Sequence, residues 1–343
     1  MKEVMGIMNT NVIKGNFTKE HILQLLKSRK MLILIIMLIG FALRLCYIGG
    51  IPCGLNQDEA FAGYNAYSLL HYGMDSSGYH NPVYLVAWGS GMNALESYLM
   101  IPFVALFGLE TWVIRLPQAL LGCASLVVFY LLLKKVFNNR TAVMGLIVLA
   151  VCPWHIMMSR WGLESNLAPA FLLFGLYFFV RGAEDNSKWF YASAVSYGLC
   201  LYSYATLWPI LPVLLLLQVI YCLCYKKISL RDKHFWLAVV VLGVMALPLL
   251  LFLLVNYGYI GEIRTGLLSV PKLTALRSGE ISLKNLPENL QTTYQMILTQ
   301  TDKNYYNAIG EFGIYYKFSN VFVALGVGVL FVGMIQNFRE KVF

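Results

Sequence analysis

The adjacent acids Asp58 and Glu59 are the side chains of this sequence whose type and place best suit chemistry. Carboxyl groups serve as general acids and bases in enzymes, so the pair is a candidate for proton transfer. It follows residues 51–57, which contain a proline and a glycine and interrupt the chain just after an apolar run. Asn56 or Asp58 can cap the helix that we expect at about 59–71, and Glu59 would be a favourable charge in its first turn. Capping and catalysis can coexist, so both roles of Asp58 stay open.

Two arginines flank the acid-rich segment 49–111, which contains five acids and no Lys or Arg. Arg44 and Arg115 each lie at the end of an apolar run next to this segment. An arginine inside a membrane span is a sign of function, although near the end of a span it can reach the lipid headgroups. The two cations could pair with the acids of 49–111 or bind an anionic lipid phosphate.

Three further side chains are candidates for a site. Arg160 and Glu164 lie in the short connection 159–166, where Glu164 could serve the site or only supply a charge to the start of the next helix. His80 lies within 49–111. A lone histidine in a loop is more often a hydrogen-bonding residue than a ligand.

The composition indicates an all-α polytopic membrane protein. Of 343 residues, 59% are hydrophobic and 13% are charged, which leaves too few polar side chains for a soluble protein of this length. Several apolar runs reach the roughly 18–20 residues that cross a bilayer. The net charge of +9 comes from Lys and Arg spread over short connections between these runs. This is typical of orientation signals and argues against nucleic acid as a partner.

We predict about eight transmembrane helices. Their ranges are 31–48, 112–133, 141–158, 166–182, 189–206, 207–225, 235–256 and 319–336. Basic residues before the first span place the tail, 1–30, in the cytoplasm, and every later short basic connection then falls on the same side. This topology requires that 92–108 lies along the outer interface as an amphipathic helix instead of crossing the membrane.

The topology divides the chain into four parts: the tail 1–30, a transmembrane module 31–256, an outer loop 257–318, and a last span with a cytoplasmic end, 319–343. The module includes the first outer loop, 49–111. Long loops usually carry function. The tyrosines of 257–318 could form a lid that stacks on a ligand or an interfacial belt, and both alternatives stay open.

Several motifs resemble glycosyltransferases of the GT-C fold, family 39, the relatives of protein O-mannosyltransferases and of the aminoarabinose transferase of lipid A. Residues 54–60 (GLNQDEA) are similar to the Asp-Glu motif in the first outer loop of that family. Residues 72–78 (YGMDSSG) resemble the Gly-x-Asp-x-x-Gly of bacterial members, and 159–164 (SRWGLE) the second acidic motif. A Phe-Gly pair followed by Arg-Leu-Pro, within 107–117, also matches. The order and spacing of the motifs carry the resemblance, because no single motif is specific.

The resemblance implies a GT-C helical bundle that transfers a sugar from a polyprenyl-phosphate donor to an acceptor hydroxyl, with inversion at the anomeric carbon. It implies Asp58 as the base, with Glu59 and Glu164 orienting acceptor or donor. The candidates for binding the donor phosphate are Arg44, His80, Arg115, Arg160 and Lys303. The Lys-Pro-Pro of many relatives is replaced by His-Asn-Pro at 80–82, which puts that phosphate contact in doubt. The chain also ends earlier than its relatives, as a short member or a fragment would.

The remaining expectations are coarser. The acceptor could be a protein, a glycolipid or a cell-wall polymer; no cofactor is indicated, and a divalent metal is possible. We expect the plasma membrane as the location, with the N-terminus inside and the site outside. A transporter or flippase of lipid-linked sugars is the alternative function, which would be expected to show internal repeats and broken helices near the midplane. A non-catalytic membrane scaffold would leave the acids of 49–111 unexplained.

Overall fold

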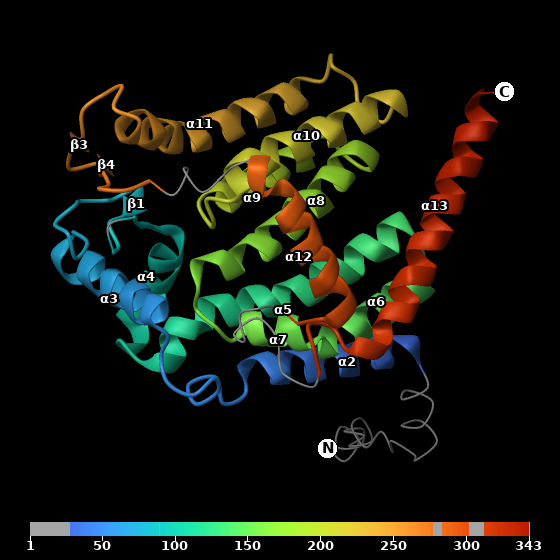
Figure 1. Cartoon of the computed structure of the whole chain (residues 1–343), viewed down its shortest axis with the longest axis horizontal. Helices are drawn as coiled ribbons and strands as arrows, with labels where there is room; N and C mark the ends of the chain where they lie inside the picture. Colours follow the sequence, from blue (N-terminus) through green and yellow to red (C-terminus); the bar gives the residue numbers. More distant parts are fainter. Residues whose placement is uncertain (1–27, 89, 277–282, 302–311, 343) are drawn as a thin grey trace, which may run out of the picture.

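The computed structural model describes residues 28–88, 90–276, 283–301 and 312–342, and a bundle of apolar helices forms its body (Figure 1). The long apolar helices are α2 (Arg29–Leu45), α5 (Thr111–Val136), α6 (Asn139–Val151), α8 (Glu164–Glu184), α9 (Trp189–Leu201), α10 (Leu207–Cys224), α11 (Lys233–Asn256) and α13 (Asn320–Val342). The short helix α7 (Pro153–Ser159) follows α6. The predicted all-α class is confirmed.

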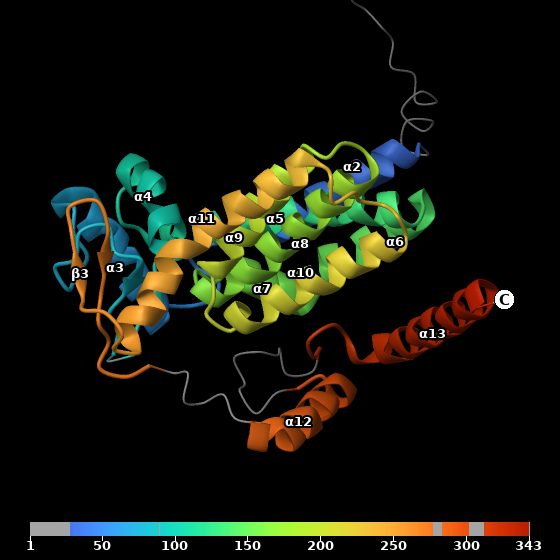
Figure 2. The same ribbon diagram turned by 90° about the horizontal axis from the view of Figure 1, so that it is seen from above.

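The first loop folds into an end cap on one end of the bundle (Figures 1 and 2). The end cap contains the helices α3 (Gln57–Tyr72) and α4 (Leu95–Phe107) and the strands β1 (Tyr84–Leu85), β2 (Met92–Asn93), β3 (Ile263–Arg264) and β4 (Ser269–Val270). Strand β1 pairs antiparallel with β2, and β3 with β4. A bridge between Pro82 and Ser269 joins the two hairpins, so the beginning of the second loop packs onto the first.

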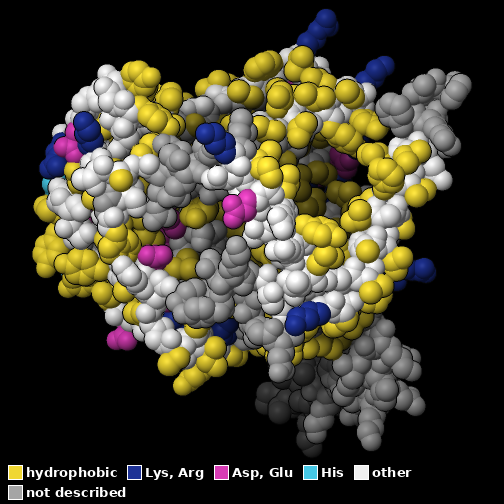
Figure 3. Space-filling model, viewed as in Figure 1, with side chains coloured by type: hydrophobic (Ala, Val, Ile, Leu, Met, Phe, Trp, Pro, Cys, Tyr) yellow, Lys and Arg dark blue, Asp and Glu magenta, His cyan; other side chains and the backbone are white. Residues whose placement is uncertain are grey.

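Small residues let the bundle helices approach closely. A Cβ atom on Gly175 of α8 would lie 2.4 Å from the ring of Tyr197 on α9. The Ser193 hydroxyl donates to the Gly175 carbonyl oxygen at 2.8 Å, which links the same two helices. Short side chains at helix contacts are typical of membrane bundles, where close backbone approach replaces the hydrophobic effect as the source of packing energy. Figure 3 shows hydrophobic side chains over the face of the bundle and only scattered charges, as expected for helices that face lipid.

Judged by length and composition, fewer helices qualify as membrane spans than the eight that the sequence predicts. Among the described residues, five helices qualify, and a sixth does if α6 and α7 form one bent span. Helices α2 and α9 have 17 and 13 residues, respectively, below the 18 that this criterion requires. The structure therefore shows a polytopic membrane bundle without confirming a count of eight.

The predicted span 141–158 is not continuous. Its two pieces, α6 and α7, meet at Cys152 and are bent by 61°. Pro153 occupies the first turn of α7, where its missing N–H costs nothing, and it could not have continued α6.

Two helices of the first loop agree with their predictions within a few residues. The expected helix at about 59–71 is α3, which begins two residues earlier at Gln57. The expected interfacial helix 92–108 is α4, shortened at its start because Met92 and Asn93 form strand β2. On the C-terminal side, α12 (Leu286–Thr299) and α13 stand apart from the bundle in Figure 2.

Candidate active site

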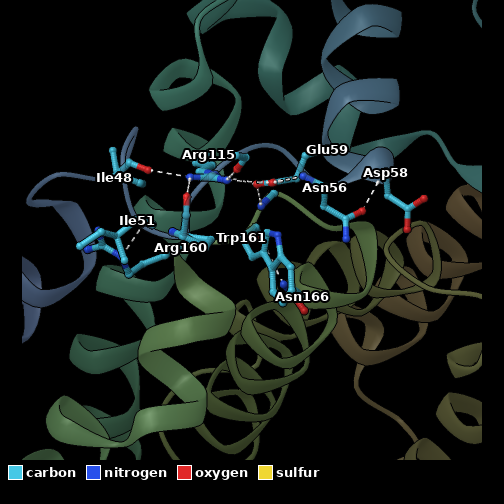
Figure 4. A network of polar contacts seen from close by, with 12 residues as sticks. Ile48, Ile51, Asn56, Asp58, Glu59, Arg115, Arg160, Trp161 and Asn166 are labelled. Atoms are coloured by element: carbon cyan, nitrogen blue, oxygen red, sulfur yellow. Dashed lines mark hydrogen bonds and ion pairs between the residues drawn. The ribbon is translucent and has the colours of Figure 1, made fainter. Parts of the chain in front are cut away.

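Asp58 and Glu59 are neighbours in sequence with opposite surroundings. The N-cap of α3 is Asn56, whose Oδ1 accepts a hydrogen bond from the Asp58 backbone N–H at 2.8 Å. The prediction that Asp58 could cap this helix is therefore wrong. Asp58 is exposed and points away from the Glu59–Arg115 pair (Figure 4), whereas Glu59 is fully buried. Asn56, and not Asp58, thus supplies the side-chain oxygen that caps α3.

Glu59 forms a buried ion pair with Arg115 of α5. Arg115 Nε lies 2.8 Å from Glu59 Oε1, and both side chains have 0% exposure. The same carboxylate accepts hydrogen bonds from the backbone N–H groups of Asn56 and Gly162 at 3.0 and 2.9 Å. Of the alternatives for Arg115, the structure shows pairing with an acid of the loop. The pair ties the start of α3 to α5 and to the segment after α7, and so holds Asp58 in place.

Arg115 has no donor to spare for a phosphate. Its Nη1 donates to the carbonyl oxygens of Ile48 and Pro52 at 3.0 and 2.8 Å. Its Nη2 donates to the Gly54 carbonyl oxygen and to Glu59. A guanidinium has five N–H groups, and these contacts use it as a clamp on the loop that follows α2.

Arg44 and Arg160 also bind backbone carbonyl groups. Arg44 Nη1 donates to the carbonyl oxygens of Gly40 and Ala150 at 2.8 and 3.1 Å, and no ion pair of this residue is found among the described residues. Arg160 donates to the carbonyl oxygens of Leu43, Cys46, Tyr47 and Ile51 at 2.7, 2.9, 3.1 and 3.1 Å. Pairing of Arg44 with an acid of 49–111 is therefore not found among the described residues, and its contact with a lipid phosphate stays a prediction. Both arginines fix the end of α2 against α6 and α7.

His80 lies at the far end of α3 from Asp58. Its Nδ1 is 2.8 Å from the carbonyl oxygen of Gly73, the C-cap of α3. The 15 residues from Asp58 to Gly73 rise by about 22 Å along the helix at roughly 1.5 Å each. The structure therefore does not bring His80 and Asp58 to one reacting centre. Lys303 lies outside the described residues.

Glu164 is the first residue of α8 and half-buried. Its Oε2 accepts a hydrogen bond from the backbone N–H of Asn93 in β2. Its position agrees with a charge at a helix start, and the bond also joins α8 to the end cap. Glu59 accepts from the N–H of Gly162, two residues before Glu164, so both acids belong to the same short stretch of contacts.

The structure adds three buried polar residues that the sequence did not mark as a site. Asn93, Glu96 and Gln118 are 1%, 0% and 3% exposed, and each has at least one side-chain atom without a hydrogen-bond partner. Burial, with the nearby charges of Glu59 and Glu164, raises the pKa of Glu96 to about 8. Asn93 and Glu96 lie in the apolar segment 92–108, where such side chains would be costly inside a bilayer, and this cost was the signal in the sequence that could have marked them.

The second loop meets the first around Tyr79. The Tyr79 hydroxyl donates to Glu262 Oε1 at 2.5 Å and accepts from Arg264 Nη2 at 2.9 Å. The Asn81 amide donates to the Gly266 carbonyl oxygen at 3.0 Å. These contacts lie at the His80 end of α3, so this part of 257–318 packs away from Asp58. A lid formed by its tyrosines stays a prediction, and Tyr305 and Tyr306 lie outside the described residues. Among the described residues, no group of three His, Cys, Asp or Glu side chains is placed to hold a metal ion.

Known proteins share both sequence and fold with this chain. Residues 95–254 match the family described as dolichyl-phosphate-mannose-protein mannosyltransferase. The YycA protein of Bacillus subtilis (strain 168), named as a candidate mannosyltransferase, is 24% identical over 176 residues, which are 49% of this chain and 25% of that protein.

Two solved structures are similar to this chain in fold. ArnT from Cupriavidus metallidurans in the apo state gives a TM-score of 0.50 at 19% identity, covering 68% of this chain and 44% of that one. The Archaeoglobus fulgidus oligosaccharyltransferase tethered with an acceptor peptide gives 0.51 at 15% identity, covering 92% and 39%. The chain has the GT-C fold.

The family match covers much of the helical bundle but does not include the Asp-Glu motif. The family match includes Glu96, Arg115, Arg160 and Glu164, whereas Asp58 lies before its first residue. The chain spans a quarter of the length of YycA and less than half of each of the two solved structures. The likeness to the solved structures establishes the GT-C fold.

Proposed function

We propose that this GT-C protein is a membrane glycosyltransferase that moves a sugar from a polyprenyl-phosphate donor to an acceptor hydroxyl on the outer face of the cytoplasmic membrane. The observation that carries the proposal is an exposed carboxylate, Asp58, held by the buried Glu59–Arg115 pair. The matched family supports the donor class, since its description names dolichyl-phosphate-mannose. A lipid-linked donor also suits an outer face, where nucleotide sugars are not available.

Asp58 acts as the general base in this proposal. Its carboxylate takes the proton of the acceptor hydroxyl while that oxygen attacks the anomeric carbon of the sugar. The bond between this carbon and the phosphate oxygen breaks, and polyprenyl phosphate leaves with the bonding electron pair. One direct displacement inverts the configuration at the anomeric carbon. Glu164 orients a substrate near the start of α8, and Glu59 is a positioning residue because its oxygens are already bound by the protein.

The leaving phosphate needs a cation or hydrogen-bond donors to stabilise its charge. The contacts of Arg44, Arg115 and Arg160 bind carbonyl groups and Glu59, so we no longer assign the phosphate to them. We do not assign it to His80 either, which lies at the opposite end of α3 from Asp58. Lys303 of the second loop stays our candidate for this contact.

Purified protein incubated with undecaprenyl-phosphate mannose, labelled in the sugar, tests the proposal. An enzyme releases labelled mannose slowly to water or transfers it to an acceptor in membrane extract. A flippase reconstituted in vesicles moves the labelled lipid between leaflets with no bond broken. Absence of any cleavage or transfer with this donor and a matched panel of other hexose and pentose donors contradicts the enzyme proposal.

The proposed orientation places the end cap outside. Cys53 lies in the loop before α3 and is exposed. In a variant whose other six cysteines are replaced by alanine, we expect a membrane-impermeant maleimide to label Cys53 in intact cells. Labelling only after the cells are lysed would place the end cap inside.

A further inference from the structure

The buried polar atoms without a partner are concentrated in one place. Within the described part of the chain, the buried side-chain nitrogen and oxygen atoms that lack a hydrogen bond are both amide atoms of Asn93, both carboxyl oxygens of Glu96 and the Oε1 atom of Gln118. Buried polar groups are nearly always hydrogen-bonded in folded proteins, because leaving them unpaired costs free energy. Five such atoms on three residues therefore require an explanation.

The three residues meet beside the start of α8. The backbone N–H of Asn93 donates to Glu164, and Glu96 lies three residues further on, in the first turn of α4. Glu96 is close enough to Glu59 and Glu164 for their charges to act on it. Gln118 of α5 donates from Nε2 to the carbonyl oxygen of Asn166 at 2.7 Å, two residues beyond Glu164. The unpaired atoms come from β2, α4 and α5, and helices α4, α5 and α8 pack against one another.

The charge of this cluster selects the chemistry of a ligand. Glu96 and Glu164 bring carboxyl groups, and Asn93 and Gln118 bring amides. Arg115, which lies on α5 three residues before Gln118, is already paired with Glu59. The Glu164 carboxylate would repel a phosphate, whereas hydroxyl groups can both donate to carboxyl and amide oxygens and accept from an amide N–H. The same donors and acceptors suit a neutral or amino-bearing sugar ring.

We propose that Asn93, Glu96 and Gln118, with Glu164 beside them, form the pocket that holds the hydroxyl groups of the transferred sugar, apart from its phosphate. The proposal rests on the proposed function for the identity of the ligand. The backbone N–H of Asn93 binds Glu164, and that of Gly162, two residues earlier, binds Glu59, so the proposed pocket adjoins the start of α3, the helix that carries the base. The unpaired atoms are then the hydrogen-bonding groups that the sugar completes.

Binding of two lipids separates recognition of the sugar from recognition of the phosphate. We expect the purified wild-type protein to bind undecaprenyl-phosphate mannose at least tenfold more tightly than undecaprenyl phosphate, measured by competition with a labelled lipid. Glu96→Leu should remove this preference while leaving the binding of undecaprenyl phosphate within twofold. Glu96→Gln keeps two hydrogen-bonding atoms and should retain part of the preference.

A matched control variant and a stability measurement distinguish loss of the pocket from misfolding. Ser125→Ala removes another buried side-chain hydrogen bond of α5, one that is satisfied by the carbonyl oxygen of Leu121, and should keep the preference. Glu96→Leu should melt no lower than wild type, because the carboxyl it removes is unpaired. A melting temperature well below wild type for Glu96→Leu and Glu96→Gln alike would show a structural role and overturn the proposal.

The pocket and the proposed function can fail separately. If wild type prefers the mannose lipid, loses this preference in Glu96→Leu and transfers no sugar, the pocket stands and the enzyme proposal fails. If transfer occurs and Glu96→Leu leaves the KM for the mannose lipid unchanged, the enzyme stands and the pocket fails. Equal loss of binding for both lipids in Glu96→Leu also contradicts the pocket.

Discussion

Replacing Glu59 by glutamine tests how the end cap is held. The substitution keeps the size of the side chain and removes the charge opposite Arg115, which is itself 0% exposed. Breaking a buried ion pair on one side costs about 3–5 kcal/mol, because the other charge is left buried without compensation. The backbone N–H groups of Asn56 and Gly162 also lose part of their acceptor. We therefore expect a destabilisation of about 4 kcal/mol.

The assay is thermal unfolding of the purified protein in one detergent. A loss of this size corresponds to a melting temperature lower by about 10 °C, taking roughly 2–4 °C per kcal/mol for a chain of a few hundred residues. Glu110→Gln is the matched control, since Glu110 is an exposed acid of the same loop whose side chain makes no capping hydrogen bond. We expect that control to melt within about 1 °C of wild type, because surface substitutions away from such contacts change stability little.

A double variant distinguishes the ion pair from the shape of the site. Glu59→Gln combined with Arg115→Met removes both charges, and we expect it to lose less than the sum of the two single losses, because the ion pair is lost only once and no charge is left buried alone. The reasoning is refuted if Glu59→Gln has the same melting temperature as Glu110→Gln. It is also refuted if the double variant loses the sum of the two single losses.

Two further predictions concern the packing around this site. Burial, with the charges of Glu59 and Glu164, raises the pKa of Glu96 from 4.5 to about 8, so the folded state binds this proton more tightly and the free energy of unfolding falls as pH rises through that range. Glu96→Gln should flatten the fall in melting temperature between pH 5 and 8, and an unchanged slope would contradict the burial of an ionisable Glu96. A Cβ atom on Gly63 of α3 would lie 2.7 Å from Cδ1 of Ile114, so Gly63→Val should push α3 off α5 and lower both melting temperature and transfer. The exposed neighbour Tyr64 provides the control, since Tyr64→Val should leave both near wild type.

Much of the helical framework follows from apolar runs and their breakers. The predicted ranges of the long helices agree with α5, α8, α10 and α11 to within a few residues, because each run is long and bounded by polar or basic residues. The break at Pro153 was missed because the hydrophobic run continues across it, and hydrophobicity alone does not report a bend of 61°. The end of α9 at Leu201 was missed for the same reason.

Which of Asp58 and Glu59 is buried and which is exposed could not be predicted from their positions in the sequence. Successive residues of a helix differ by about 100° in direction, so one of the two had to face the protein, but which one depends on α5. Arg115 lies more than fifty residues later and selects Glu59. The contacts of Arg44 and Arg160 could not be predicted for a different reason. Their acceptors are backbone carbonyl groups, which every residue has.

The transfer rate of Asp58→Asn tests the central claim most directly. Asparagine keeps the shape of the side chain and cannot take the acceptor proton, and a general base contributes about 10²–10⁴-fold to a rate. With labelled undecaprenyl-phosphate mannose as donor, we predict at least a 100-fold lower kcat at an unchanged melting temperature, while Glu110→Gln transfers as wild type does. An Asp58→Asn protein that keeps more than half of the wild-type rate would contradict the assignment of Asp58 as the base.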